Sequence, residues 1–128
     1  MRWGLIPSWA SDSNVGARTI NARSESAASK PSFRERLRKQ RCPVLVDAFY
    51  EWRRSGKDKQ PFCFEVENGV VFAFAGLWDC WRAPDRQFVE SCTILTTTPN
   101  ELLAGVHDRM PAIPSSCTTA GSIQRCWI

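Results

Sequence analysis

The segment His107-Asp108-Arg109-Met110-Pro111 places an imidazole directly beside a carboxylate and a guanidinium, and it contains the only histidine of the chain. Histidine is the side chain whose unperturbed pKa lets it exchange protons near neutral pH. A lone histidine more often has a structural role. Acid–base chemistry at His107 therefore requires partners from elsewhere in the sequence.

Three further polar positions lie in apolar or aromatic surroundings and could be those partners: Asn21, Glu51 and Thr96. Glu51 is flanked by Tyr50 and Trp52. Burial would raise the pKa of this carboxyl and let it act as a general acid near neutral pH. Strand alternation alone favours the opposite arrangement, in which Glu51 points to water while Tyr50 and Trp52 pack inside.

Runs rich in β-branched and aromatic residues predict the strands that must position these groups. We expect extended structure over residues 19–23, 42–52, 61–66, 70–75 and 88–97, and a tryptophan-bearing loop over residues 76–84. Asn68-Gly69 is a strong turn signal and predicts a hairpin between two of these runs, 61–66 and 70–75. The sum is an α+β domain dominated by antiparallel sheet.

Capping residues predict short helices between these strands. Ser32 and Glu35 have the spacing of a capping box and predict a basic helix over residues 33–40. Thr98, followed by Pro99 and Glu101, predicts a helix that ends just before His107. A further short helix is expected near residues 24–29.

Composition is typical of one domain of 128 residues, because 43% of the residues are hydrophobic. No apolar run approaches the roughly 20 residues of a membrane span, so no membrane association is expected. The net charge of +4 is concentrated in residues 30–41, which hold six basic residues and one acid. Such a segment is typical of a protein that binds a polyanion, although a solvated surface helix explains it equally well.

Several kinds of site are not indicated by the sequence. The six cysteines include no C-x-x-C pair, so we expect neither a metal site nor a disulfide scaffold, and we expect most of the thiols to be reduced. There is no Gly-x-Ser-x-Gly motif and no glycine-rich phosphate loop. No cofactor is therefore expected.

Seven motifs occur in the order that is found in the SRAP family, the SOS-response-associated peptidases, and the resemblance covers residues 2–113. The motifs are Arg2-Trp3-Gly4-Leu5-Ile6-Pro7-Ser8-Trp9, Asn21-Ala22-Arg23-Ser24-Glu25, Lys30-Pro31-Ser32-Phe33-Arg34, Arg41-Cys42-Pro43, Phe49-Tyr50-Glu51-Trp52, Ala75-Gly76-Leu77-Trp78 and His107-Asp108-Arg109-Met110-Pro111. Members of this family sense abasic sites in single-stranded DNA during the SOS and DNA-damage response. The resemblance implies an α+β fold with a curved, barrel-like antiparallel sheet, short flanking helices and a basic groove.

The resemblance also implies a covalent chemistry. An N-terminal cysteine, exposed by autopeptidase activity of the cysteine type, captures the aldehyde of an abasic site. Its amine forms a Schiff base, and its thiol then closes a thiazolidine ring, which leaves a DNA–protein crosslink. Matched motif by motif, Asn21 would orient the amine and the sugar, Glu51 would shuttle protons, and His107 would act as acid, base or electrostatic partner. A free α-amine suits aldehyde capture because its pKa of about 7.7–8.0 leaves more of it unprotonated than a lysine amine.

The same match implies the DNA contacts. Arg23, Thr96 and Arg109 would contact phosphates, and Trp3 would lie against a base or along the DNA path. The partner is then single-stranded DNA with abasic sites, bound by a monomer in the cytoplasm or nucleoid of a bacterium or in the nucleus of a eukaryote.

Both ends of the chain depart from the family pattern. The family begins with Met-Cys-Gly-Arg several dozen residues before the first motif, whereas here that motif begins at Arg2. We therefore expect residues 1–113 to be an SRAP core that lacks its N-terminal cysteine segment, and residues 114–128 to be an atypical tail. The isolated chain should then form no heat-stable crosslink on a denaturing gel. The alternatives are a single-stranded-DNA-binding module without crosslinking, or an inactive fragment.

Overall fold

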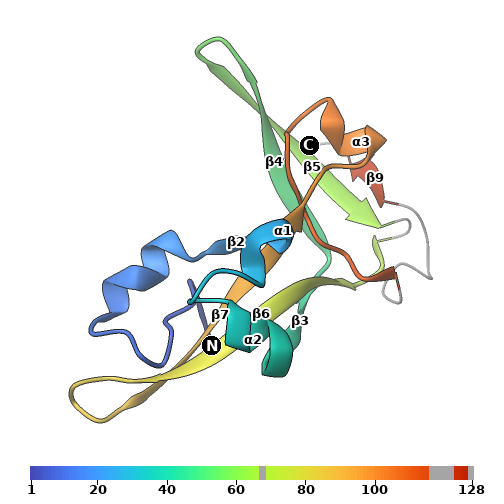
Figure 1. Cartoon of the computed structure of the whole chain (residues 1–128). Coiled ribbons are helices and arrows are strands. Elements are labelled where there is room, and N and C mark those ends of the chain that lie inside the picture. The colour runs from blue at the N-terminus through green and yellow to red at the C-terminus, as the bar shows by residue number, and fades with distance from the viewer. Residues whose placement is uncertain (67–68, 116–122, 127–128) are drawn as a thin grey trace. The chain divides into compact units, whose positions relative to one another are not determined.

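The computed structural model describes residues 1–66, 69–115 and 123–126 (Figure 1). Most of the elements are strands, and the helices are short. The helices are η1 (Ser13–Arg18), α1 (Ser24–Ala27), α2 (Arg34–Lys39) and α3 (Glu101–Ala104). The strands are β1 (Arg2–Trp3), β2 (Asn21–Arg23), β3 (Arg41–Val46), β4 (Ala48–Ser55), β5 (Asp58–Val66), β6 (Phe72–Arg82), β7 (Phe88–Thr97), β8 (Met110–Pro111) and β9 (Ile123–Cys126).

The chain divides into two compact units. The first comprises Met1–Val44 and Ala75–Thr96, and the second comprises Leu45–Phe74 and Thr97–Ile128. Asn21 belongs to the first unit, whereas Glu51 and His107 belong to the second.

The first unit is built around a mixed sheet in which β7 is the common partner. The order β1-β7-β6-β3 runs through it, and β2 also pairs with β7. β6 and β7 are antiparallel, but β1 and β2 both run parallel to β7. The sheet is therefore mixed, and these two short strands depart from the antiparallel pairing that was expected to dominate. The chain between them passes through η1, which returns it so that it can pair with β7 in the same direction twice.

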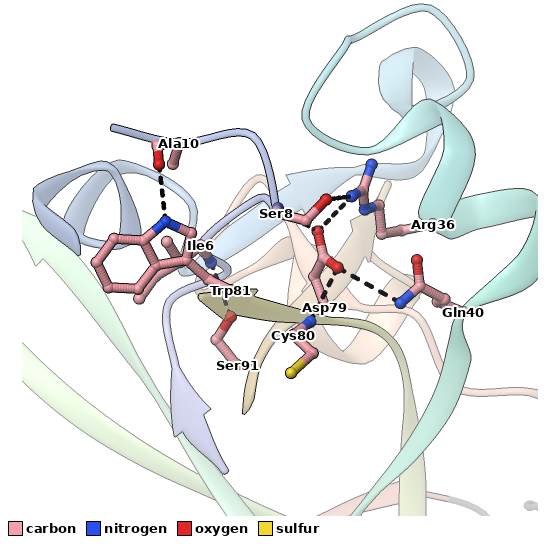
Figure 2. A network of polar contacts seen from close by, with 9 residues as sticks. All are labelled: Ile6, Ser8, Ala10, Arg36, Gln40, Asp79, Cys80, Trp81 and Ser91. Atoms are coloured by element: carbon pink, nitrogen blue, oxygen red, sulfur yellow. Dashed lines mark hydrogen bonds and ion pairs between the residues drawn. The ribbon is translucent and has the colours of Figure 1, made fainter. Parts of the chain in front are cut away.

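A buried polar network connects α2, β6 and the loop at Ser8 in the first unit (Figure 2). Arg36 on α2 is 8% exposed and forms an ion pair with Asp79 on β6, which is 3% exposed. The Arg36 guanidinium also donates to the Ser8 hydroxyl at 2.6 Å, and the backbone N–H of Ser8 donates to Asp79 at 2.7 Å. The side-chain amide of Gln40 approaches Asp79 at 3.5 Å. The network therefore fixes α2 and the loop at Ser8 against β6.

Position 4 of the first unit requires glycine, both for its backbone angle and for the space around it. Its φ of 109° is in a region that side chains with a Cβ rarely adopt. A Cβ at this position would lie 2.5 Å from the backbone oxygen of Gly16. The close contact between the two glycines holds η1 against the loop that follows β1.

The second unit contains a separate antiparallel sheet in the order β4-β5-β9. β4 and β5 form a long hairpin in which Ala48 pairs with Glu65 and Ser55 pairs with Asp58. A cluster of phenylalanines forms its core, with ring centroids 5.4–6.4 Å apart. The members of this cluster are Phe49, Phe64, Phe72 and Phe74.

The predicted strands are partly confirmed. The strand over 88–97 is confirmed as β7, but the predicted strand 42–52 is two strands, β3 and β4, interrupted at Asp47 and assigned to different sheets. The predicted hairpin between 61–66 and 70–75 is wrong, since β5 pairs with β4 and β9 rather than with β6. The predicted loop 76–84 is also wrong, because β6 continues to Arg82. Which strands pair with each other depends on contacts between distant parts of the chain, and local sequence does not encode these contacts.

The predicted helices form, but their caps differ. α1, α2 and α3 lie within or near the expected ranges. Phe33 is the N-cap of α2 and makes no side-chain capping bond, so the capping box at Ser32 is wrong. The N-cap of α3 is Asn100 rather than Thr98, and its side chain accepts from the N–H of Leu103 at 3.0 Å.

Other expectations are tested only within the described residues. Cys42, Cys80 and Cys92 are free, as expected, whereas Cys63 is disulfide-bonded. No helix among the described residues is long and apolar enough to cross a membrane. The described part of the predicted tail includes β9, which pairs with β5. Closure of the sheets into a barrel stays a prediction.

Candidate active site

Glu51 lies on the inner face of β4. The strand buries Phe49 and half-buries Glu51, while Tyr50 and Trp52 are 54% and 48% exposed. The arrangement that strand alternation alone favoured is therefore wrong, because the two aromatic side chains are exposed and the carboxylate between them is half-buried. Phe49 packs into the phenylalanine cluster, and this contact sets which face of β4 turns inward.

A hollow of about 200 Å³ in the second unit is lined by Glu51 and His107 together. The other lining residues are Trp52, Arg54 and Lys59, all from the β4–β5 hairpin. Two of the three groups to which the sequence analysis gave a reaction role thus share one cavity, although they are more than fifty positions apart in the chain. An acid and an imidazole in one small cavity can transfer protons to and from a bound molecule.

The pKa of Glu51 is raised above its ordinary value of 4.5, chiefly because burial removes water from the carboxylate. Three smaller influences act on it. The charge of His107 and a hydrogen bond from the backbone N–H of Trp52 lower the pKa, and the neighbouring Asp108 raises it. Glu51 is therefore shifted toward the protonated form, which is the form that a general acid needs.

His107 is positioned by the end of α3 and by the residues that follow it. Its backbone N–H donates to the carbonyl of Leu103 at 2.9 Å. The backbone N–H of Arg109 donates to Nδ1 at 3.0 Å, so the neutral imidazole carries its proton on Nε2. When the ring is protonated, Nδ1 can instead donate to the Arg109 carbonyl at 3.1 Å or to Asp108 at 3.3 Å. The ring is thus oriented through Nδ1 in both charge states, which leaves Nε2 to act on a ligand.

The raised pKa of Glu51 predicts a dependence of stability on pH. A carboxyl whose pKa is higher in the folded state destabilises the fold when it is ionised, and this cost disappears as pH falls through the folded pKa toward 4.5. The variant Glu51→Gln should therefore unfold at a higher urea concentration than the wild type at pH 7. The difference should shrink toward pH 4.5. Urea denaturation of both proteins across this range measures it, and a difference that grows toward acid pH would contradict the assignment.

Four residues that were predicted to contact DNA or to position the sugar lie along one edge of β7 in the first unit. β1 pairs Trp3 with Cys92, and β2 continues along the same strand, pairing Asn21 with Ile94. Arg23 is paired with Thr96 in this ladder. The residues in this row, which we call the β7-edge row, are Trp3, Asn21, Arg23 and Thr96.

The β7-edge row presents an aromatic, an amide and a cation to solvent. Trp3 is 57% exposed, and its indole N–H donates to the Ile20 carbonyl at 2.8 Å, which fixes the ring beside Asn21. Asn21 and Arg23 are both exposed, because the buried Ala22 between them occupies the inner face of β2. An exposed tryptophan near an exposed cation is a combination that suits single-stranded nucleic acid.

The predicted site residues therefore fall into two groups. Glu51 and His107 share the hollow of the second unit, where Arg109 contacts His107 through its backbone. Asn21 belongs with the β7-edge row of the first unit. No group of three potential metal-binding side chains occurs among the residues that the structure describes.

Sequence reasoning missed Arg54 and Lys59. Both line the hollow, and they are paired directly across the β4–β5 hairpin. The turn signal at Ser55-Gly56 was available, and counting outward from it would have placed these two residues opposite each other. Their proximity to His107 could not be read from any local pattern.

These features define a class of α+β proteins in which a mixed β-sheet predominates, the helices are short, and a carboxyl and an imidazole share one cavity. The family description SOS response associated peptidase (SRAP) matches residues 1–121. The chain therefore belongs to the SRAP family.

Relatives and solved structures agree with this membership. The abasic site processing protein YoqW of Bacillus subtilis is 48% identical over 114 residues, which cover 88% of this chain and 51% of the relative. The abasic site processing protein HMCES of Xenopus tropicalis is 36% identical over 135 residues, covering 88% of this chain and 40% of the relative. A crystal structure of a Bacteroides thetaiotaomicron protein matches with a TM-score of 0.84 and 34% identity, covering 91% of this chain and 54% of that one. The chain thus spans about half the length of the curated relatives that it matches.

Proposed function

We propose that this chain acts on abasic sites in single-stranded DNA, with Glu51 and His107 carrying out the proton transfers. The observation that carries this proposal is the half-buried Glu51 carboxyl beside His107 in one cavity. The relatives that are named abasic site processing proteins support the choice of substrate.

The first reaction step is opening of the abasic sugar. The bond between C1′ and O4′ breaks, O4′ gains a proton, and the C1′ hydroxyl loses its proton to solvent, which leaves an aldehyde. Glu51 in its protonated form supplies the proton to O4′, which its raised pKa favours. The Nε2–H of neutral His107 donates a hydrogen bond to an oxygen of the sugar and holds it in place.

The second step is capture of the aldehyde by a 1,2-aminothiol. Glu51 first regains a proton from solvent. The amine adds to C1′, and the resulting hydroxyl leaves as water with the proton from Glu51. The thiol then adds to the imine carbon while its proton passes to the imine nitrogen, which closes a thiazolidine. In the family pattern an N-terminal cysteine supplies both groups. The first cysteine of this sequence is Cys42, so a test on this chain needs an added aminothiol. Autopeptidase or lyase-like chemistry would use the same acid and imidazole.

The β7-edge row binds the DNA strand in this proposal. Asn21 orients the sugar and the attacking amine, and Trp3 stacks on a base, where each stacked base contributes about 1–3 kcal/mol. Arg23 and Thr96 contact phosphates, and they are adjacent in the β2–β7 ladder. Arg109 provides a further phosphate contact in the second unit.

The test supplies the nucleophile from solution. A single-stranded oligonucleotide with one abasic site is mixed with L-cysteine, and thiazolidine formation is followed by mass spectrometry with and without the 128-residue chain. We expect the chain to accelerate capture by at least about 10²-fold, since positioned general acids contribute about 10²–10⁴-fold. A rate equal to that in buffer would contradict the proposal. Salt-dependent retention of undamaged single strands without acceleration would instead support a simple binding module.

A further inference from the structure

Two cations lie opposite each other near the turn of the β4–β5 hairpin. Arg54 on β4 is directly paired with Lys59 on β5, and both are exposed. Both also line the hollow that contains Glu51 and His107. The cavity therefore has an acid–imidazole side and a cationic side.

Neither cation has an ion-pair or hydrogen-bond partner among the residues that the structure describes. The neighbouring Arg53 differs, since it donates to the Gln60 side chain at 2.8 Å and lies 5.0 Å from the centroid of the Phe62 ring. Arg53 thus makes contacts within the hairpin, whereas the side chains of Arg54 and Lys59 remain available to bind a ligand.

Like charges that face each other across an antiparallel pair destabilise the pair. Glu51 forms no ion pair with either cation among the described residues, so no direct salt bridge relieves this repulsion. An anion bound between the two cations would relieve it. Phosphate is the anion that suits such a pair, because an arginine offers two parallel N–H donors and a lysine adds a point charge.

We infer that Arg54 and Lys59 form a phosphate-binding subsite of the Glu51–His107 cavity that holds a phosphodiester of the bound strand. Its position beside the abasic sugar rests on the proposed function, whereas the anion site itself does not. The subsite adds to the phosphate contacts of the β7-edge row and supplies one at the reacting sugar.

The anion site is tested first with inorganic phosphate. Phosphate should raise the Tm of the wild type, and this shift should be lost in Lys59→Gln and in Arg54→Gln. Without phosphate, each variant should have a slightly higher Tm than the wild type, because the repulsion is removed. The matched control is Lys57→Gln, which removes the same charge from the turn of the same hairpin but does not line the cavity. A phosphate shift that Lys59→Gln and Lys57→Gln retain equally would overturn the inference.

The phosphodiester is tested with a single-stranded oligonucleotide that carries a tetrahydrofuran abasic analogue, by fluorescence anisotropy at several salt concentrations. Each of the two variants should reduce the slope of log K against log salt by about 0.7, and Lys57→Gln should leave it unchanged. Unchanged slopes in both variants would remove the phosphodiester assignment. If the slopes fall as expected but the wild type does not accelerate cysteine capture, the subsite stands and the proposed function fails.

Discussion

Glu51→Gln should lower the accelerated rate of cysteine capture by about 10²-fold, which is the lower end of the range for a positioned general acid. Glutamine has the same shape but no transferable proton. The loss should therefore appear in the rate and not in the affinity for an oligonucleotide with an abasic analogue. Mass spectrometry of the thiazolidine product measures the rate, and anisotropy measures the affinity.

The matched control is Glu65→Gln, on the adjacent strand β5 of the same hairpin. Glu65 is also half-buried but does not line the cavity. This control should leave the capture rate within a factor of two. His107→Ala should lower the rate as well. Equal capture rates for the wild type and Glu51→Gln would contradict the role of the Glu51 carboxyl as a general acid.

Asp79→Ala should lower the free energy of unfolding by about 3–5 kcal/mol, the cost of leaving one member of a buried ion pair without its partner. Arg36 is 8% exposed, and its Nε has no hydrogen-bond partner within the described part of the chain, so the guanidinium depends on Asp79 and Ser8 for compensation (Figure 2). The loss would be a large share of the 5–15 kcal/mol that stabilises an ordinary domain. Urea denaturation monitored by tryptophan fluorescence measures it.

Two further variants separate the ion pair from other effects. Glu90→Ala removes an exposed carboxylate from β7 in the same unit and should change stability by less than about 0.5 kcal/mol. Replacing both partners, Arg36→Met with Asp79→Leu, should recover most of the loss, because two apolar side chains of similar size leave no charge unpaired. A double variant as unstable as Asp79→Ala would show that the network acts through its hydrogen bonds to the loop at Ser8 instead.

The chemistry of the site was easier to predict from the sequence than its geometry. His107 and Glu51 were selected by residue type and by aromatic surroundings, and they share a cavity. Which way Glu51 faces was predicted wrongly from strand alternation, because two aromatic neighbours normally indicate the buried face. The orientation of β4 is set by Phe49, which packs against Phe64 and Phe74. Local sequence does not predict these long-range contacts.

The fold shows the same division between local and distant information. The extended run of β7 was predicted with its bounds, since ten residues of strand-favouring sequence leave little choice. The interruption at Asp47 was not predicted from the sequence. It places β3 and β4 in different sheets and so determines in which sheet Glu51 lies. The parallel pairing of β1 and β2 with β7 also depends on segments far apart in sequence.

We propose that the carboxyl of Glu51 and the imidazole of His107 act together on one abasic sugar in an unpaired strand. A crystal structure of the chain with a single-stranded oligonucleotide that carries a tetrahydrofuran analogue tests this most directly. We expect the analogue to lie within hydrogen-bond distance of the side chains of Glu51 and His107. A sugar bound away from the cavity of Glu51 and His107 would contradict the proposal.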